Sequence, residues 1–511
     1  MYEAGLPADF QRRWWETRWF LLGIALLAAL PLLYPPIPPL VDLFGHMGRY
    51  RVQLDLDGSP WLGTYYGFHW AAIGNLGVDL LVMPLGKLIG LEPAVKLIVL
   101  AIPPFTGVGF LWVSREVHGR VPPTSLFALP FVLGHPFLFG FVNFSLSMAL
   151  AFVGFGLWLR LARLGRTGLR AILFVPISIV VFFAHTFGWG TLGLLCFSAE
   201  AVRQHDRGVG WLTAGLRAGL HASVMALPVF VMLGWRRETH GGMTRGWFEW
   251  ANKWEWVYSA LRDRWQLFDI ASVAAVGLVI AFAIFHRRLA FSRNLAFSAL
   301  VLFVAFLILP WTVFGSAYAD MRIVPYVLAV IVLAIRFRDE GRGALARNLA
   351  ILGSLFCVVR FAATAASLAI ASNDQQAKLA ALEHVPAGAR VATLVGYDCP
   401  KPWPLLRNSH LGGMVIVRRD GFSNDQWVIE GTNLLRLRYR QAGLFAADPS
   451  QIVRPNRCRF PWTVNAALRA LPRRSFDYLW LIDPPPFDER LIAGMRPVWR
   501  GPGSILYRVQ P

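Results

Sequence analysis

The feature that most constrains this chain is a series of apolar segments, each long enough to cross a lipid bilayer. Covering about 30 Å of hydrocarbon takes roughly 20 apolar residues in a helix. Such segments occur at 18–35, 93–113, 123–140, 143–161, 170–186, 188–203, 213–234, 267–286, 294–316, 321–337 and 346–371. They predict a mainly α-helical, polytopic membrane protein with about eleven transmembrane helices.

The composition agrees with a membrane protein and excludes several other classes. Of the 511 residues, 56% are hydrophobic and 16% are charged, whereas soluble domains are about 25% charged. The net charge of +20 comes from Arg residues placed between apolar runs. This spacing indicates a membrane topology signal and contact with anionic lipids, so no nucleic acid partner is expected.

The Arg-bearing loops predict the orientation of the chain. Short loops after the second, fourth, sixth, eighth and tenth spans carry Arg115 and Arg120; Arg160, Arg163 and Arg166; Arg203 and Arg207; Arg287, Arg288 and Arg293; and Arg336, Arg338 and Arg342. The positive-inside rule places these loops in the cytoplasm, together with the N-terminus and its Arg12, Arg13 and Arg18. The stretch 72–90 is then an interfacial or re-entrant segment.

This topology divides the chain into a membrane domain and an outer tail. Residues 1–371 form the transmembrane domain, with 36–92 as a long first outer loop. Residues 372–511 are predicted to be a small periplasmic α/β domain. Its expected helices are 374–385 and 463–471, and its expected strands are 389–396, 413–417, 477–483 and 504–509.

The first outer loop contains a cluster of ionisable residues just beyond the first span. Asp42 and His46 are four residues apart, so a helix puts them on one face, and Arg49 and Arg51 follow. A carboxylate can deprotonate an acceptor hydroxyl and a guanidinium can hold phosphate, so we predict Asp42 and His46 as catalytic and Arg49 and Arg51 as phosphate-binding. The alternative is that Asp42 caps the helix that follows.

A second ionisable pair lies at the outer start of the tenth span. Asp320 and Arg322 are placed where a lipid phosphate would lie, and ionisable residues at this depth are functional candidates. We predict that Arg322 binds the donor phosphate and that Asp320 orients Arg322. The alternative is a local ion pair that anchors the helix end.

Other polar residues lie near the outer ends of the spans. His69, His135, Asn143 and His185 are candidates for lining one outward-facing cavity. A divalent metal site is conceivable because His is a common ligand, but no HxxxH or HExxH spacing supports one, so no cofactor is assigned. Interhelical hydrogen bonding by these side chains is the alternative. The loop 236–266 is rich in Trp, which suits sugar stacking or an interfacial aromatic belt.

The architecture is similar to that of the GT-C superfamily of integral membrane glycosyltransferases, in its uncharacterised bacterial branch. The resemblance rests on one span followed by a long outer loop that opens with Asp42–Leu43–Phe44–Gly45–His46, on the interfacial segment 72–90 and on the outer tail. It implies a polyprenyl-phosphate-linked sugar donor and an acidic catalytic residue at Asp42. His46 replaces a second acidic residue of the best-known members.

The resulting prediction is a transferase that moves a sugar from a lipid-phosphate donor to a glycan, lipid or protein acceptor on the outer face of the bacterial inner membrane. Two alternative functions remain: a secondary transporter or lipid flippase, and a non-catalytic subunit of an envelope polysaccharide assembly machine.

Cys399 and Cys458 are the two cysteines of the tail. They are predicted to form a disulfide in the oxidising periplasm, with two free thiols as the alternative.

Overall fold

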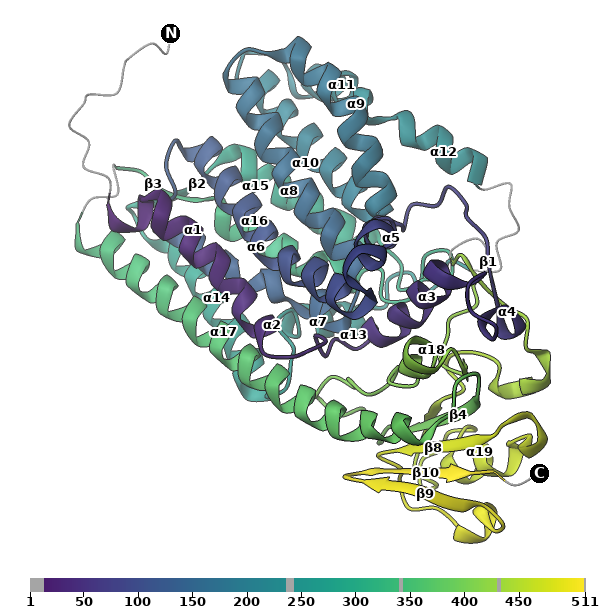
Figure 1. The fold of residues 1–511 in the computed structure, drawn as a ribbon. Helices are drawn as coiled ribbons and strands as arrows, with labels where there is room; N and C mark the ends of the chain where they lie inside the picture. Colours follow the sequence, from purple (N-terminus) through teal and green to yellow (C-terminus); the bar gives the residue numbers. More distant parts are fainter. Residues whose placement is uncertain (1–12, 236–242, 340–342, 430–432, 510–511) are drawn as a thin grey trace.

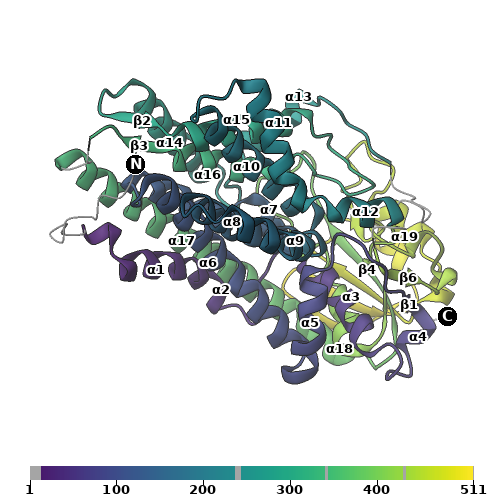
Figure 2. The ribbon, with the colours of Figure 1, turned by 90° about the horizontal axis from the view of Figure 1, so that it is seen from above.

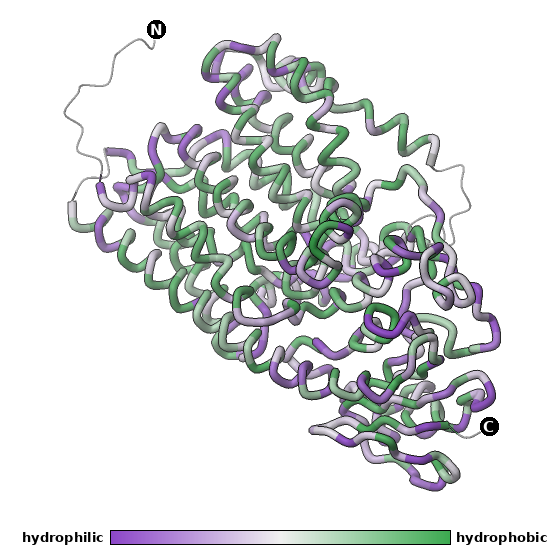
Figure 3. Tube along the Cα trace, viewed as in Figure 1, coloured by the Kyte–Doolittle hydropathy of each residue, from purple (hydrophilic) through white to green (hydrophobic). Residues whose placement is uncertain are grey.

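The computed structural model describes residues 13–235, 243–339, 343–429 and 433–509, and it consists of a helical bundle joined to a smaller mixed region (Figure 1). Arg12, Arg342 and the first part of the Trp-rich loop, 236–242, lie outside the described residues. Hydrophobic residues dominate the bundle, whereas hydrophilic residues gather at its ends and over the tail (Figure 3).

Each predicted span coincides with helical structure. The bundle contains α1 (Arg18–Leu26), α2 (Leu30–Leu33), α6 (Leu91–His118), η3 (Pro123–Leu133), α7 (His135–Phe139), α8 (Val142–Arg163), α9 (Thr167–Ala184), α10 (Thr186–His205), α11 (Trp211–Ala222), α12 (Leu227–Trp235), α14 (Gln266–Phe285), α15 (Arg293–Ile308), α16 (Val324–Leu333) and α17 (Ala344–Leu379). Within the described residues, five helices are long and apolar enough to cross a membrane, or six if the bent α11–α12 pair is one span. The total of eleven therefore stays a prediction.

The Arg-bearing loops meet at one end of the bundle. Arg163 pairs with Glu116 at 2.7 Å and Arg293 pairs with Asp206. The short strands β2 (Leu289–Phe291) and β3 (Ile335–Phe337) pair with each other, which joins the loops after the eighth and tenth spans. The tail lies at the opposite end, reached by the 36-residue helix α17 (Figure 2).

This arrangement predicts the outcome of a topology experiment. Alkaline phosphatase fused to the C-terminal end should be active, and a green fluorescent protein fused there should be dark, because the tail lies opposite the Arg loops. Cell-based activity and fluorescence measure the two fusions. An inactive phosphatase fusion together with a fluorescent protein fusion that fluoresces would contradict the predicted orientation.

The first outer loop folds against the bundle and the tail. It contains α3 (Leu43–Asp55), α4 (Leu62–Tyr65), β1 (Tyr66–Phe68) and α5 (Gly77–Ile89). At about 1.5 Å per residue, the 13 residues of α5 reach roughly 20 Å, which is too short to cross the hydrocarbon core. It packs against α6 and α3. Its position at the membrane interface stays a prediction.

The tail is built around a six-stranded mixed sheet in the order β5–β4–β8–β10–β9, with β7 also paired to β4. The strands are β4 (Arg390–Gly396), β5 (Phe422–Ser423), β7 (Ile452–Val453), β8 (Tyr478–Ile482), β9 (Arg496–Gly501) and β10 (Ser504–Arg508), with α19 at Val464–Ala470. The strand expected at 413–417 is wrong: these residues belong to helix α18 (Gly413–Arg419). α18 packs against α3, and this tertiary contact overrides the β propensity of its Val and Ile residues.

The tail and the first outer loop are interleaved rather than separate. Strand β1 pairs antiparallel with β6 (Leu435–Leu437) of the tail. The predicted boundary after residue 371 falls inside α17, so the last span continues into the tail without a linker. The disulfide between Cys399 and Cys458 is confirmed, with the two Cα atoms 6.2 Å apart.

Candidate active site

Asp42 lies where the chain leaves the first span and enters α3. Four prolines, at 35, 36, 38 and 39, end the preceding helix. The backbone N–H of Asp42 donates to the carbonyl of Phe139 at 2.9 Å. Gly140 has a positive φ of 100°, and a Cβ there would come within 2.7 Å of the Asp42 nitrogen, so only glycine fits this approach.

The side chain of Asp42 does not cap α3. It precedes Leu43, the first residue of the helix, but makes no capping hydrogen bond. Asp42 therefore occupies the N-cap position of α3, as the alternative interpretation expected, but its side chain does not do the capping. Its carboxylate faces a cavity of about 1070 Å³ between the bundle and the tail.

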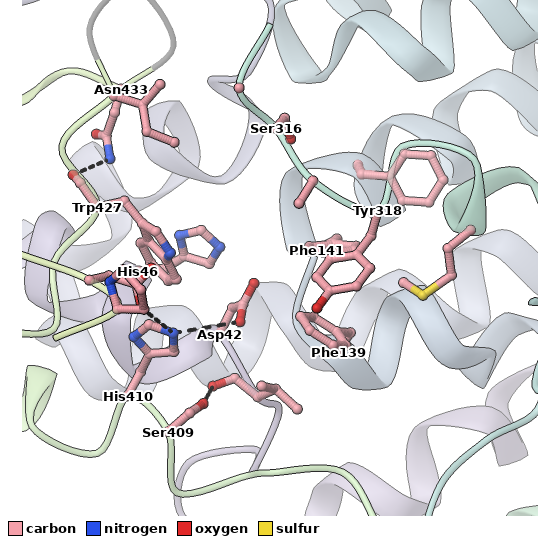
Figure 4. A pocket seen from close by; sticks show the side chains of 18 of the residues that line it. Asp42, His46, Phe139, Phe141, Ser316, Tyr318, Ser409, His410, Trp427 and Asn433 are labelled. Carbon is pink, nitrogen blue, oxygen red and sulfur yellow. Dashed lines mark hydrogen bonds and ion pairs between the residues drawn. The ribbon is translucent and has the colours of Figure 1, made fainter. Parts of the chain in front are cut away.

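Residues of the tail complete the surroundings of Asp42 (Figure 4). His410 Nε2 lies 3.9 Å from Oδ1 of Asp42 and 3.9 Å from Oδ1 of Asp448. The Nδ1 of His410 bonds the backbone carbonyl of Asp425 at 3.1 Å, which turns Nε2 toward the two carboxylates. Trp427 packs against both His410 and His46, with ring centroids 4.3 and 5.0 Å away.

A buried arginine and a glycine allow the tail to reach this position. Arg407 donates to the carbonyl of Pro39 and to Asp263, so one buried guanidinium ties the start of the first loop to the segment that carries His410. A Cβ on Gly45 would lie 2.7 Å from the Trp427 ring. A glycine on this face of α3 therefore lets Trp427 reach the site.

Burial sets the protonation of the central carboxylates. It raises the pKa of Asp42 to about 7, an effect that His410 opposes and Asp448 reinforces. Burial also raises the pKa of Asp425 to about 6. The pKa of His46 falls well below its ordinary value through burial and the nearby charge of Arg49. A carboxylate that gains and loses a proton near neutral pH is suited to general base catalysis.

Arg322 faces the same cavity from the start of α16. It donates to Ser316 Oγ at 2.8 Å and to the Ala317 carbonyl at 3.2 Å, and its guanidinium lies 4.1 Å from the Phe141 ring. Its Nε is buried and, among the described residues, has no hydrogen-bond partner. A guanidinium that is fixed by its neighbours and lines a cavity is able to bind an anion there.

The predicted role of Asp320 is wrong. Its carboxylate turns away from Arg322 and accepts from Lys253 Nζ at 3.2 Å. That ammonium also donates to the carbonyls of Phe306 and Leu309, each at 2.8 Å. Asp320 therefore fixes the base of the Trp-rich loop and does not line the cavity.

The other predicted residues divide into two groups. His46, Arg49, His135, Asn143 and His185 line the cavity with Asp42. Arg51 and His69 are not part of its wall: Arg51 pairs with Asp420 at 2.8 Å and with Asp55 at 3.0 Å. The placement of Arg51 at the donor phosphate is therefore wrong. Arg51 follows Arg49 by two residues in a helix, and side chains at this spacing point in different directions.

Asp79 and Asn143 form a polar contact under the cavity that the sequence did not suggest as a unit. Arg49 pairs with Asp79 at 3.0 Å, and Asn143 donates to the same carboxylate at 2.9 Å.

Among the described residues, one group of three possible metal ligands lies close together: Asp398, Cys399 and Cys458. The two cysteines are joined as a disulfide, so this group offers no thiolate pair.

Comparison with known proteins places the fold. No protein-family model and no curated protein matches the sequence. The crystal structure of ArnT from Cupriavidus metallidurans in the apo state matches with a TM-score of 0.51 and 12% identity over 96% of this chain and 97% of that one. The structure of the same protein bound to undecaprenyl phosphate matches with a TM-score of 0.45 and 10% identity, at the same coverage. The apo match shows that this chain shares the fold of ArnT.

Proposed function

We propose that this chain is a membrane glycosyltransferase that moves a sugar from a polyprenyl-phosphate-linked donor to an acceptor on the outer face of the bacterial inner membrane. The observation that carries the proposal is the placement of Asp42. Its carboxylate is buried, makes no capping hydrogen bond to α3, and faces the cavity beside His410 of the tail. The fold shared with ArnT and the resemblance to the GT-C superfamily support the same activity by analogy.

The cavity residues suggest how the reaction proceeds. The acceptor hydroxyl attacks C1 of the sugar, the bond from C1 to the phosphate oxygen breaks, and Asp42 takes the hydroxyl proton. The lipid phosphate leaves carrying the electron pair of the broken bond. The positive charge of Arg322, which lines the cavity, stabilises the negative charge that develops on the phosphate.

The proposal is tested with purified protein reconstituted in vesicles that contain a radiolabelled polyprenyl-phosphate sugar. A membrane fraction supplies the acceptor. A glycosyltransferase consumes the donor and releases free polyprenyl phosphate, which thin-layer chromatography separates. Movement of the intact donor between leaflets without cleavage would instead support a flippase, and no donor turnover with any sugar of a panel would contradict the proposal.

The pH dependence of the reaction should follow the ionisation of Asp42. A general base acts when deprotonated, so the rate should rise with pH and level off above an apparent pKa of about 7. Because the charge of Asp448 raises the pKa of Asp42, Asp448→Asn should move the rising limb to lower pH. Initial rates from roughly pH 5 to 9 measure both curves. A pH-independent rate would exclude Asp42 as the base.

A further inference from the structure

Three cations of the cavity wall, a part of the wall that we call the mouth, are not used by the proposed reaction. Arg262, Lys401 and Arg454 line the wall where the Trp-rich loop meets the tail. Their ion pairs within the described residues all go to one carboxylate, Glu255, at 3.4 Å from Arg262 and 3.7 Å from Lys401. Arg454 forms no ion pair with a described carboxylate, so this mouth has an excess of positive charge.

Besides the single carboxylate of Glu255, the groups that hold these cations in place are uncharged aromatic rings and backbone carbonyls. Arg454 lies between the rings of Tyr397 and Phe460, 4.0 and 5.5 Å from their centroids. It also donates to the carbonyl of Asp398 at 2.8 Å. A guanidinium held in this way keeps its charge and its remaining N–H groups for a ligand.

Arg262 and Lys401 are held by the same kind of contact. Arg262 is buried, lies 4.9 Å from the Trp403 ring, and donates to the carbonyls of Trp403 and Pro402 at 2.8 Å each. Lys401 lies 5.8 Å from the Trp256 ring. Burial and the charges of Arg262 and Arg454 lower the pKa of Lys401, as expected where like charges gather without enough counter-charge.

The mouth is continuous with the surroundings of Asp42. The ring of Tyr318 lies 5.9 Å from Trp256 on one side and 5.1 Å from Phe139 on the other. Phe139 accepts the backbone hydrogen bond of Asp42. The disulfide joins the two segments that carry Lys401 and Arg454, so it fixes the cations relative to each other.

We propose that this mouth is an acceptor subsite that binds a phosphate or carboxylate group, so the acceptor is an anionic glycan or glycolipid. The inference rests on the proposed function and adds the chemical class of the acceptor. The acceptor anion contacts Lys401 and Arg454, and a hydroxyl of the same molecule reaches Asp42. Arg322 binds the donor phosphate, so the cavity holds the donor phosphate and the acceptor anion at two different places.

The test is calorimetric titration of the full-length protein in detergent with glucose 6-phosphate, glucuronate and glucose. We expect at least one anionic sugar to bind at least about tenfold more tightly than glucose, the scale of a charge-assisted hydrogen bond. The double variant Lys401→Gln, Arg454→Gln should lose that preference. A preference for glucose 6-phosphate alone identifies phosphate, and one for glucuronate alone identifies carboxylate.

Two further variants decide where the anion binds. Arg457→Gln is the matched control, because Arg457 is exposed, pairs with Asp398 and does not line the cavity, so this variant should keep the preference. If Arg322→Gln removes the preference and the double variant keeps it, the anion sits in the donor pocket and the inference is overturned. Equal binding of all three sugars by the unmodified protein also overturns it.

The titration separates this inference from the proposed function. It requires no turnover, so an anion preference without transferase activity would contradict the proposed function and leave the subsite intact. Transferase activity without any anion preference would contradict the subsite alone.

Discussion

Asp42→Asn is expected to lower the turnover of sugar transfer by about 10³-fold, within the range that general base catalysis contributes. Asparagine keeps the shape of the side chain but cannot accept the acceptor proton. The fold should not change, because the Asp42 side chain makes no capping hydrogen bond that the variant could lose. Donor consumption measures the turnover, and thermal unfolding of the purified variant measures its stability.

The matched control for this variant is Asp57→Asn. Asp57 belongs to the same outer loop but is exposed and lies outside the cavity wall. It should retain full activity. An Asp42→Asn protein that turns over at the unmodified rate would show that Asp42 is not the base, even if the chain proves to be a glycosyltransferase.

The sequence was most informative where a local pattern has a single physical cause. An apolar run of some 20 residues can adopt few structures other than a buried helix or a membrane helix. Helical structure is present at each predicted span. The buried strands β4 and β8 were likewise found from their runs of Val, Leu and Trp. The same reasoning failed at α18, because its conformation depends on contact with α3 rather than on its own residues.

The half of the site contributed by the tail could not be predicted in this way. Arg407 contacts Pro39 across 368 positions of the chain, and His410 and Asp448 lie in irregular segments without a repeating pattern. No local spacing rule connects such residues with Asp42. A polar run such as Ser423–Asn424–Asp425–Gln426 in an apolar protein was the one available signal, and it does not specify a partner.

Arg322→Gln is expected to lower turnover by about 10²-fold, the scale of losing one preorganised donor to a developing negative charge. Glutamine keeps some hydrogen-bonding capacity toward Ser316 but carries no positive charge to offset the leaving phosphate. Arg322→Lys should not restore the rate, because an ammonium cannot replace the planar guanidinium that contacts Ser316 and Ala317 and lines the cavity. Initial rates at saturating donor measure the effect.

Arg51→Gln provides the matched comparison, because the sequence assigned the same phosphate-binding role to Arg51 and Arg322. The structure separates them: Arg51 pairs with Asp420 and Asp55 outside the cavity, whereas Arg322 faces it. Losing a partly exposed ion pair costs about 1 kcal/mol or less of stability and should leave turnover unchanged. Equal losses of turnover in the two variants would mean that Arg322 acts through general charge or stability, and the leaving phosphate would then require another partner in the cavity.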